Sequence, residues 1–441
     1  MKLNINTDRL LTELHRLARI TDCPQTEDKS LPEPTQAVTR IVFTPRDLEA
    51  RAWLKSLAKA AGFSVREDPV GNTFMRWQGS EPALGVVGTG SHTDAIPHAG
   101  MYDGTVGVLG GLEALRSLKE AGFQPKRSLE LLMFTSEEPT RFGIGCLGSR
   151  LLGGVLDGET ADGLRDRLHE TDPNAAEGLS LHEVREAAGF HGVLGSVKLP
   201  PHYYDAWVEL HIEQGPLLER DNVELGIVTN IAAPASYRYS IEGFGGHAGA
   251  LLMPDRHDAL CAAAEVILSV ERHALAANAH ARAEGQSGVD TVATVGMVAV
   301  HPGAVNSVPS RVQFTLDIRD TDVARRDSVM EALHADIQEI EKRRKVRVTE
   351  ELINADQPAH SDPRIIAALE AACQEENATF RRMVSRAYHD TNFIAPIAPV
   401  AMLFIPCRSG VSHRPDEYAT PEAIVLGTCV LAQTLAKLAM A

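Results

Sequence analysis

Five residues of this chain are of types that bind divalent metal ions, and each stands in a glycine-rich segment or near the end of an apolar one. They are His92, Asp103, Glu138, His211 and His413. A sixth residue, Glu137, directly precedes Glu138. Two divalent cations that share one carboxylate can activate a water molecule, and a second carboxylate nearby can accept its proton. The pattern therefore favours a metal-dependent hydrolase.

Alternating strands and helices are expected to position these residues in the first part of the chain. Apolar runs and helical periodicity predict two strands and two helices there, at 85–90, 129–135, 46–61 and 104–121. Such alternation is typical of an α/β layer fold, in which ligands bind at the carboxyl ends of the strands. His92 and the pair Glu137 and Glu138 each follow one of these strands, so we expect the chemistry at this edge.

A different pattern begins after residue 228 and predicts an inserted second domain. Its expected elements are a strand, a helix, two strands, a helix and a strand, at 237–242, 258–273, 291–300, 312–317, 328–344 and 345–350. This βαββαβ order is that of a ferredoxin-like unit. Because His413 lies beyond it, the chain must return to the first domain. We therefore expect a discontinuous catalytic domain at 1–228 and 351–441 around an insert at 229–350.

Length, charge and composition narrow the class of protein. The chain of 441 residues is longer than one hydrophobic core usually requires, and 44% hydrophobic with 23% charged residues is typical of a globular protein. The net charge of −16 offers no basic surface, so we expect no nucleic acid partner. No apolar run approaches the roughly 20 residues that span a bilayer, so we expect no membrane and a cytoplasmic location. Six cysteines without CxxC spacing argue against a thiolate metal site, and we expect them to be reduced and buried.

Each motif taken alone also has an ordinary structural interpretation. Asp94, two residues after His92, could accept the proton of the ring nitrogen that faces away from a metal, but loops contain such pairs by chance. Asp103 could be a helix N-cap. Adjacent glutamates often mark a solvated turn, and a histidine in an apolar strand, such as His211, is often a core residue. Arg311 could be a surface residue, or it could hold a substrate carboxylate through two hydrogen bonds.

Taken together, seven segments in order resemble the amidase/hydantoinase/carbamoylase branch of the aminoacylase and metallocarboxypeptidase superfamily. They are Gly-Ser-His-Thr-Asp (90–94), Tyr-Asp-Gly (102–104), Thr-Ser-Glu-Glu (135–138), His-Ile-Glu-Gln-Gly-Pro (211–216), Gly-Gly-His-Ala-Gly (245–249), Asn-Ser-Val-Pro-Ser-Arg (306–311) and Ser-His-Arg-Pro-Asp-Glu (412–417). The resemblance runs from about residue 41 to the C-terminus. It implies an α/β fold, with an α/β/α metallopeptidase-like catalytic domain and an inserted ferredoxin-like lid that also forms a homodimer.

The resemblance also implies a role for each residue of the site. The metal ligands would be a bridging Asp103, His92 with His211 on one ion, and Glu138 with His413 on the other. The catalytic residues would be Glu137, as general base, and Asp94 beside His92. The substrate would contact Gln214, His247, Asn306, Arg311, Tyr388 and His389. Ligands that are only oxygen and imidazole suit Mn or Zn, with Co or Ni as alternatives.

One segment distinguishes the substrates within this branch. Relatives of the carbamoylase and allantoate type usually carry Ser-Gly-Ala-Gly-His-Asp, where this chain reads Ser-Arg-Ala-Tyr-His-Asp (385–390). Tyr388 in place of glycine would fill part of the pocket and favour a small ureido acid, ureidoglycolate first, with release of ammonia. N-carbamoyl-L-amino acids and allantoate are the alternatives. A dipeptidase or aminoacylase with the same metals, or a binding protein without activity, are further hypotheses, although the five ligand positions and the base are all filled.

Overall fold

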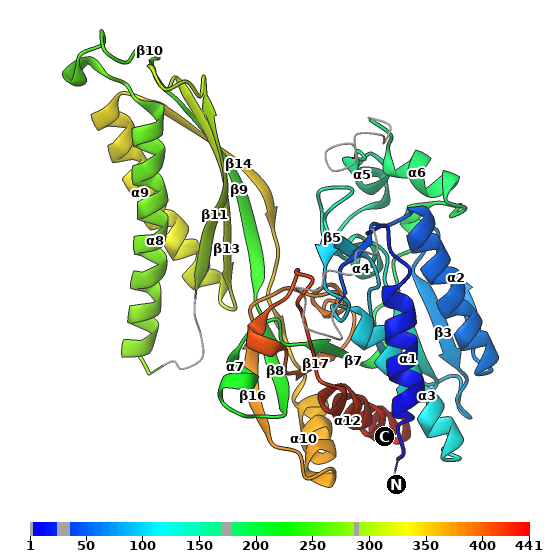
Figure 1. The fold of residues 1–441 in the computed structure, drawn as a ribbon. Coiled ribbons are helices and arrows are strands. Elements are labelled where there is room, and N and C mark those ends of the chain that lie inside the picture. The colour runs from blue at the N-terminus through cyan, green and yellow to red at the C-terminus, as the bar shows by residue number, and fades with distance from the viewer. Residues whose placement is uncertain (1–2, 24–35, 169–177, 286–290) are drawn as a thin grey trace. The chain divides into compact units, whose positions relative to one another are not determined.

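The computed structural model describes residues 3–23, 36–168, 178–285 and 291–441, and the chain divides into two units (Figure 1). Unit 1 comprises residues 1–229, 360–383 and 389–441, and unit 2 comprises 230–359 and 384–388. Each unit has hydrophobic clusters of its own, as expected of a domain.

A nine-stranded sheet forms the centre of unit 1. Its order is β15 (Ala359–His360), β8 (Leu225–Ile231), β17 (Val400–Ile405), β7 (Tyr204–Ile212), β4 (Val86–Ser91), β6 (Leu129–Met133), β3 (Thr73–Trp77) and β2 (Ser64–Glu67), and β16 (Phe380–Ser385) pairs with β8. The four central strands β17, β7, β4 and β6 are parallel, whereas β8 runs antiparallel to β17, β3 to β6 and β2 to β3. Nearly every residue of the central strands is buried, which explains why they read as apolar runs.

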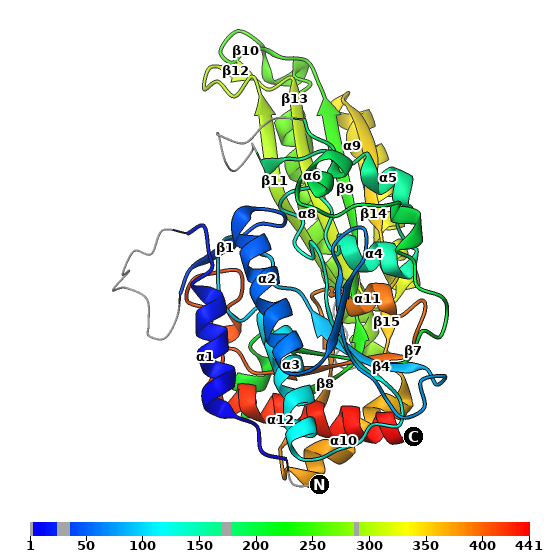
Figure 2. The same ribbon diagram turned by 90° about the vertical axis from the view of Figure 1, so that its right-hand side faces the viewer.

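Helices cover both faces of this sheet. Leu131 and Leu132 are neighbours in β6 but belong to different hydrophobic clusters, because successive side chains of a strand point to opposite faces. One cluster is completed by α1 (Thr7–Ala18), α2 (Pro45–Ala60), α3 (Thr105–Glu120), α10 (Pro363–Glu375) and α12 (Pro421–Met440). The other is completed by α4 (Leu147–Gly153), α5 (Gly158–Asp162), α6 (Leu181–Ala187) and α11 (Thr391–Ile394). Figures 1 and 2 show α1, α3 and α12 packed together.

Helix α3 lies very close to the sheet because it is rich in glycine. A Cβ atom at Gly107 would lie 2.5 Å from the backbone oxygen of Leu210 in β7, so no larger residue fits there. All but the last two residues of the helix are buried. This close contact places the start of α3, and Asp103 just before it, next to the carboxyl ends of the central strands.

Unit 2 contains the βαββαβ order predicted from the sequence. Its elements are β9 (Ala233–Glu242), α8 (Ala259–Ala283), β11 (Val292–His301), β13 (Arg311–Asp320), α9 (Val323–Arg344) and β14 (Arg347–Ala355). The four strands are antiparallel in the order β11-β13-β9-β14, and α8 and α9 pack against each other on one face. Two short strands, β10 (Gly246–His247) and β12 (Ser307–Val308), pair at one end of the unit (Figure 2).

The helices of unit 2 are longer than predicted. The first continues to Ala283, because Ala274, Asn278 and Ala281 extend the buried face beyond the predicted end at residue 273. The second begins at Val323 rather than at 328, because the Asp322 side chain accepts hydrogen bonds from two backbone N–H groups and caps it.

Two expectations from composition need correction. By length and composition α12 is long and apolar enough to span a membrane, although Gln433 and Lys437 interrupt its apolar residues. In its most apolar window 67% of the residues are buried, and it packs against α3 and α10 as a core helix. Cys261 is exposed, whereas the other five cysteines are buried; all six are free thiols.

Candidate metal centre

Four of the five candidate ligands lie at the carboxyl ends of the four central strands of unit 1. His92 directly follows β4, Glu138 follows β6, His211 is the penultimate residue of β7, and His413 lies in the loop after β17. Because these strands are parallel neighbours, their carboxyl ends meet at one edge of the sheet. Asp103 joins them from the segment that leads into α3.

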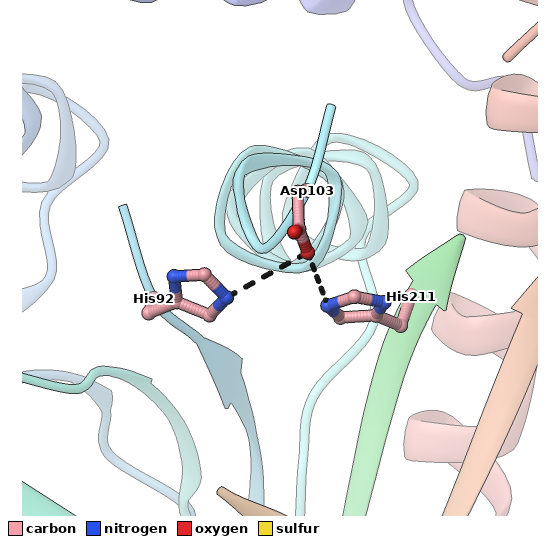
Figure 3. Close-up of side chains that lie close together, drawn as sticks. All are labelled: His92, Asp103 and His211. Carbon is pink, nitrogen blue, oxygen red and sulfur yellow. Dashed lines mark ion pairs between the residues drawn. The ribbon is translucent and has the colours of Figure 1, made fainter. Parts of the chain in front are cut away.

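The Asp103 carboxylate faces two pairs of side chains. Its Oδ1 atom lies 3.2 Å from Nε2 of His211 and 3.8 Å from Nε2 of His92 (Figure 3). Its Oδ2 atom lies 3.1 Å from Nε2 of His413, which is also 3.5 Å from Oε1 of Glu138. Within each group the potential ligand atoms lie within 4.8 Å of one another. One carboxylate therefore stands between two sets of metal-capable atoms.

Backbone carbonyls orient the two buried imidazoles. Nδ1 of His92 lies 3.0 Å from the carbonyl oxygen of Asp94, and Nδ1 of His211 lies 2.9 Å from that of Ile212. A carbonyl oxygen only accepts hydrogen bonds, so Nδ1 carries the hydrogen in each ring. In the neutral ring Nε2 then keeps a lone pair that faces Asp103, which is the tautomer that a metal ligand requires.

Asp94 differs from its expected arrangement. Its carboxylate oxygen Oδ1 lies 3.8 Å from Nδ1 of His92 and does not accept that proton. Oδ1 accepts a hydrogen bond of 3.3 Å from the backbone N–H of Glu137 instead, and Oδ2 accepts one of 3.0 Å from that of Glu138. These groups lie beyond the end of β6 and would otherwise be buried without a partner. Asp94 therefore holds the segment that carries both glutamates.

Asp103 is not the N-cap of α3. The helix begins at Thr105 with Gly104 as its cap residue, and no side chain caps it. Gly104 has a φ of +64°, and a Cβ atom there would lie 2.5 Å from the ring of His92. Only glycine allows this turn and this close approach. The Asp103 carboxylate is consequently left to face the histidines.

Glu137 stands beside the centre, with 14% of its side chain exposed. Its Oε2 atom lies 3.8 Å from Nε2 of His92, and its Oε1 atom accepts a hydrogen bond of 3.3 Å from the thiol of Cys146. The backbone N–H of Cys146 also donates to the Glu137 carbonyl at 2.7 Å. Both Ser136 and Cys146 adopt positive φ angles, so the segment before α4 is tightly constrained around this carboxylate.

Burial and mutual repulsion disfavour the ionised forms of the two glutamates. Burial raises the pKa of Glu137 well above its ordinary value, and the charges of Glu138, Asp103 and Asp94 raise it further. The pKa of Glu138 is raised well above its ordinary value too, by burial and then by Asp103 and Asp94. Negative charge is thus concentrated where little water can solvate it.

Divalent cations fit this arrangement. In the described part of the chain, the ion pairs of Glu137 and Glu138 are made only with His92 and His413. The buried Oδ1 atom of Asp103 has no hydrogen-bond partner among the same residues. Metal ions would neutralise the clustered carboxylates and satisfy the unpaired oxygen.

Two predicted substrate-binding residues of unit 1 lie against the metal-ligand candidates. Nε2 of Gln214 donates to Oδ2 of Asp103 at 3.1 Å and to Oγ of Ser412 at 3.2 Å. The buried ring of His389 packs edge-on against His211, with ring centroids 4.6 Å apart. Both residues are therefore neighbours of the centre.

The other four predicted substrate-binding residues belong to unit 2. His247 in β10 pairs with Ser307 in β12, and the backbone oxygen of Asn306 accepts a hydrogen bond from Ala248, so His247 and Asn306 are neighbours. Arg311 is the first residue of β13, and its side chain is exposed. The ring of Tyr388 lies 5.6 Å from the guanidinium carbon of Arg319. A role for these four residues at the metal centre stays a prediction.

Sequence reasoning missed two buried carboxylates in this region. Glu209 lies two residues before His211 on the same face of β7 and accepts hydrogen bonds from Ser91 and Thr391. With His211 and His389 it forms a third group of metal-capable side chains. Because alternate residues of a strand face the same side, the spacing of two between Glu209 and His211 could have identified Glu209 from the sequence.

The second missed carboxylate is Glu417, at the end of the segment 412–417. It is fully buried and accepts hydrogen bonds from the backbone N–H groups of Tyr102 and Asp103. Burial, and then the charge of Asp103, raise its pKa to about 7. No local periodicity pointed to it, because the groups that it contacts are some 314 residues away in the chain.

The metal-free protein should lose stability as the pH rises from 5 to 9. Glu137, Glu138 and Glu417 have raised folded-state pKa values, so above the unfolded value of about 4.3 the folded state binds more protons than the unfolded state. The stability that protonation provides is then lost as the pH rises through the folded values. Burial lowers the pKa of His211, but Asp103 outweighs this effect and raises it to about 9. Protonation of His211 therefore contributes stability that is also lost as the pH rises to 9.

Thermal unfolding with a chelator and with added Mn²⁺ or Zn²⁺ measures this effect. Metal ions bind the deprotonated ligands, so the increase in Tm on metal addition should grow with pH. Tm is plotted against pH with chelator and with metal, and the difference between the two plots removes the contribution of titratable groups elsewhere in the chain. A metal-dependent increase that is the same at pH 5.5 and pH 8.5 would contradict the assignment.

Comparisons with known proteins identify the family of this chain. The sequence profile of Peptidase family M20/M25/M40 matches residues 88–437. A protein of Oryza sativa subsp. japonica named ureidoglycolate hydrolase is 48% identical over 440 residues, covering 99% of this chain and 85% of that protein. N-carbamoyl-L-amino acid amidohydrolase of Geobacillus stearothermophilus is 37% identical, covering 92% and 95%. The crystal structure of AtUAH in complex with glyoxylate has a TM-score of 0.83 at 45% identity, covering 99% and 98%. The predicted α/β fold class and the family resemblance are confirmed.

Proposed function

We propose that this chain, which belongs to peptidase family M20/M25/M40, is a metal-dependent amidohydrolase that cleaves a linear C–N bond of a small ureido acid. The observation that carries the proposal is the position of Asp103 between two sets of ligand atoms. A carboxylate that is shared in this way is what a two-metal hydrolase requires.

We assign the two sets to two divalent ions. One ion would be held by His92, Asp103 and His211, and the other by Asp103, Glu138 and His413. Imidazole and carboxylate ligands favour Mn or Zn, with Co or Ni as alternatives. When bound, such ions supply Lewis acidity toward a carbonyl oxygen and lower the pKa of a coordinated water molecule.

Glu137 is assigned as the general base. The Glu137 carboxylate lies next to the centre, 3.8 Å from Nε2 of His92. The carboxylate would take a proton from the attacking water and transfer that proton to the leaving nitrogen. Asp94 supports it indirectly, because the Asp94 carboxylate holds the backbone of Glu137.

Unit 2 is assigned as a lid that completes the substrate site. His247 and Asn306 would donate hydrogen bonds to the developing oxyanion, a contribution of about 3 kcal/mol for each donor. Arg311 would hold the substrate carboxylate through two hydrogen bonds. All three side chains are exposed, whereas Ser307 of β12 is half-buried and Val308 is buried. Scattering profiles that are identical with and without a substrate analogue would contradict a closing lid.

A homodimer through unit 2 is proposed as well. Strand β11 is an edge of the four-stranded sheet, and the side chains of Met297 and Val298 in it are 71% and 48% exposed. An exposed apolar edge strand tends to associate with another chain. Sedimentation velocity should give a dimer for the natural chain and a monomer for Met297→Glu. A natural chain that stays monomeric at micromolar concentration would disprove this assembly.

Ureidoglycolate is the proposed first substrate. A relative that matches over 99% of this chain is named ureidoglycolate hydrolase, and Tyr388 would reduce the space that a longer side chain needs. Ammonia release from ureidoglycolate, allantoate and several N-carbamoyl-L-amino acids, with Mn²⁺ and Zn²⁺ supplied in turn, tests this. We expect kcat/KM for ureidoglycolate to exceed the others by roughly tenfold or more, since one additional methylene group changes affinity by about 1–3 kcal/mol.

A second candidate is hydrolysis of N-carbamoyl-L-amino acids, which the relative of Geobacillus stearothermophilus supports. Higher kcat/KM on such a substrate than on ureidoglycolate would establish it in place of the first. Turnover of dipeptides or acylated amino acids without ammonia would point to a dipeptidase or aminoacylase. Absence of turnover on every substrate by a protein that binds two metal ions would favour a binding protein.

A further inference from the structure

Glu417 connects the two segments that carry Asp103 and His413. Its Oε1 atom accepts hydrogen bonds from the backbone N–H groups of Tyr102 and Asp103, at 2.9 and 3.0 Å. Its Oε2 atom accepts a hydrogen bond from Oγ of Ser412 at 2.9 Å. One carboxylate therefore spans the loop before α3 and the loop after β17, which lie more than 300 residues apart in the sequence.

The surroundings of Glu417 are built for this carboxylate. Its side chain is fully buried, and a Cβ atom at Gly100 would lie 2.4 Å from it, so the loop that leads to Asp103 is shaped around it. In the described part of the chain, its hydrogen-bond donors are two backbone amides and one hydroxyl, and it forms no ion pair. A buried carboxylate without a cation is costly, but a hydrophobic residue in its place would leave the two backbone N–H groups without this acceptor.

The same carboxylate is linked to the side chain of Asp103 through Ser412. Oγ of Ser412 lies 3.4 Å from Oδ2 of Asp103, and Nε2 of Gln214 contacts both atoms at 3.2 and 3.1 Å. Glu417 thus acts on Asp103 twice, through its backbone N–H and through this hydrogen-bonded chain. Residue 413, the candidate ligand, follows Ser412 directly.

We propose that Glu417 is a positioning residue that fixes Asp103 and His413 relative to each other and so determines how tightly the ion between them is bound. The proposal rests on the metal centre assigned above. Hydrogen bonds from groups behind metal ligands typically change metal affinity 10- to 100-fold, because they fix the ligands in the geometry that the ion requires. Side chains that only fill space would not have this effect.

Metal affinity of Glu417→Ala, Glu417→Gln and Asp416→Asn, with Co²⁺ as the probe, tests the proposal. Competition with a chromophoric chelator should show about 10- to 100-fold weaker binding of the more weakly held ion in Glu417→Ala, with a changed Co²⁺ absorption spectrum. Glu417→Gln should recover most of the affinity, because an amide oxygen can still accept from both backbone N–H groups. Asp416→Asn removes a charge from the same loop and should match the natural protein, because among the described residues the Asp416 side chain forms an ion pair only with the exposed Arg414.

Ser412→Ala provides a second test if Glu417→Ala does not fold, since it removes a single hydroxyl. It should weaken the same ion severalfold and leave the Tm of the metal-free protein nearly unchanged. Natural affinity and an unchanged Co²⁺ spectrum in a folded Glu417→Ala or in Ser412→Ala would overturn the proposal. Failure of the natural protein to bind Co²⁺ at all would instead disprove the metal centre itself, so the two failures are distinguishable.

Discussion

Glu137→Gln should retain both metal ions and lose about 10²- to 10⁴-fold in kcat. Glutamine has the shape of glutamate but cannot accept a proton at neutral pH. Because Glu137 is not one of the metal-capable groups around Asp103, the ligand set remains complete in this variant. Loss of turnover with full metal occupancy separates a general base from a ligand.

Ammonia release measures kcat in this variant, and elemental analysis measures its metal content. Glu422→Gln is a matched control, since it makes the same change at an exposed position of α12, and it should behave as the natural chain. The thiol of Cys146 can still donate to the amide oxygen, so the local fold should be kept. Near-normal turnover of Glu137→Gln would exclude the proposed role of this residue.

Asp103→Asn should lose at least one of the two metal ions and on the order of 10³-fold or more in activity. Oδ1 of the Asp103 carboxylate faces His92 and His211, and Oδ2 faces His413 and the neighbouring Glu138. Asparagine keeps one oxygen, but its NH₂ group is a donor and cannot bind a cation. Loss of a metal ion removes several kcal/mol of transition-state stabilisation, and each 1.4 kcal/mol corresponds to a factor of about ten.

Metal stoichiometry after dialysis and kcat/KM with excess metal check this expectation. Asp416→Asn makes the same change of charge at a partly exposed side chain that pairs with Arg414, and it should keep both ions and full activity. Restoration of the activity of Asp103→Asn by excess metal would mean that the residue contributes affinity only. Two tightly bound ions and natural turnover in Asp103→Asn would refute the shared carboxylate and with it the two-metal assignment.

The regular elements around the site were predictable because they depend on local patterns. The buried runs at 85–90 and 129–135 became β4 and β6, since a parallel strand covered on both faces is apolar throughout. The position of His92 and Glu138 after these strands was therefore open to prediction. Helix ends were less predictable, because caps such as Asp322 are single side chains whose use depends on the fold around them.

Contacts between distant segments could not be predicted in the same way. We expected the Asp94 carboxylate to orient His92, but the Asp94 carbonyl does so, because the backbone N–H groups after β6 take the carboxylate. Glu417 was part of a recognised segment, yet its contact with the backbone of Asp103 appeared only when the two loops were brought together.

The sequence by itself determined the residue types of the centre, the strands that carry them and the family that uses them. The tertiary structure alone decided that Oδ1 and Oδ2 of Asp103 face different pairs of ligands. The physical reason is that residue types and periodicity are local properties, whereas the position of one oxygen atom depends on strand order and helix packing. Here the order β17-β7-β4-β6 and the close approach of α3 at Gly107 set that position.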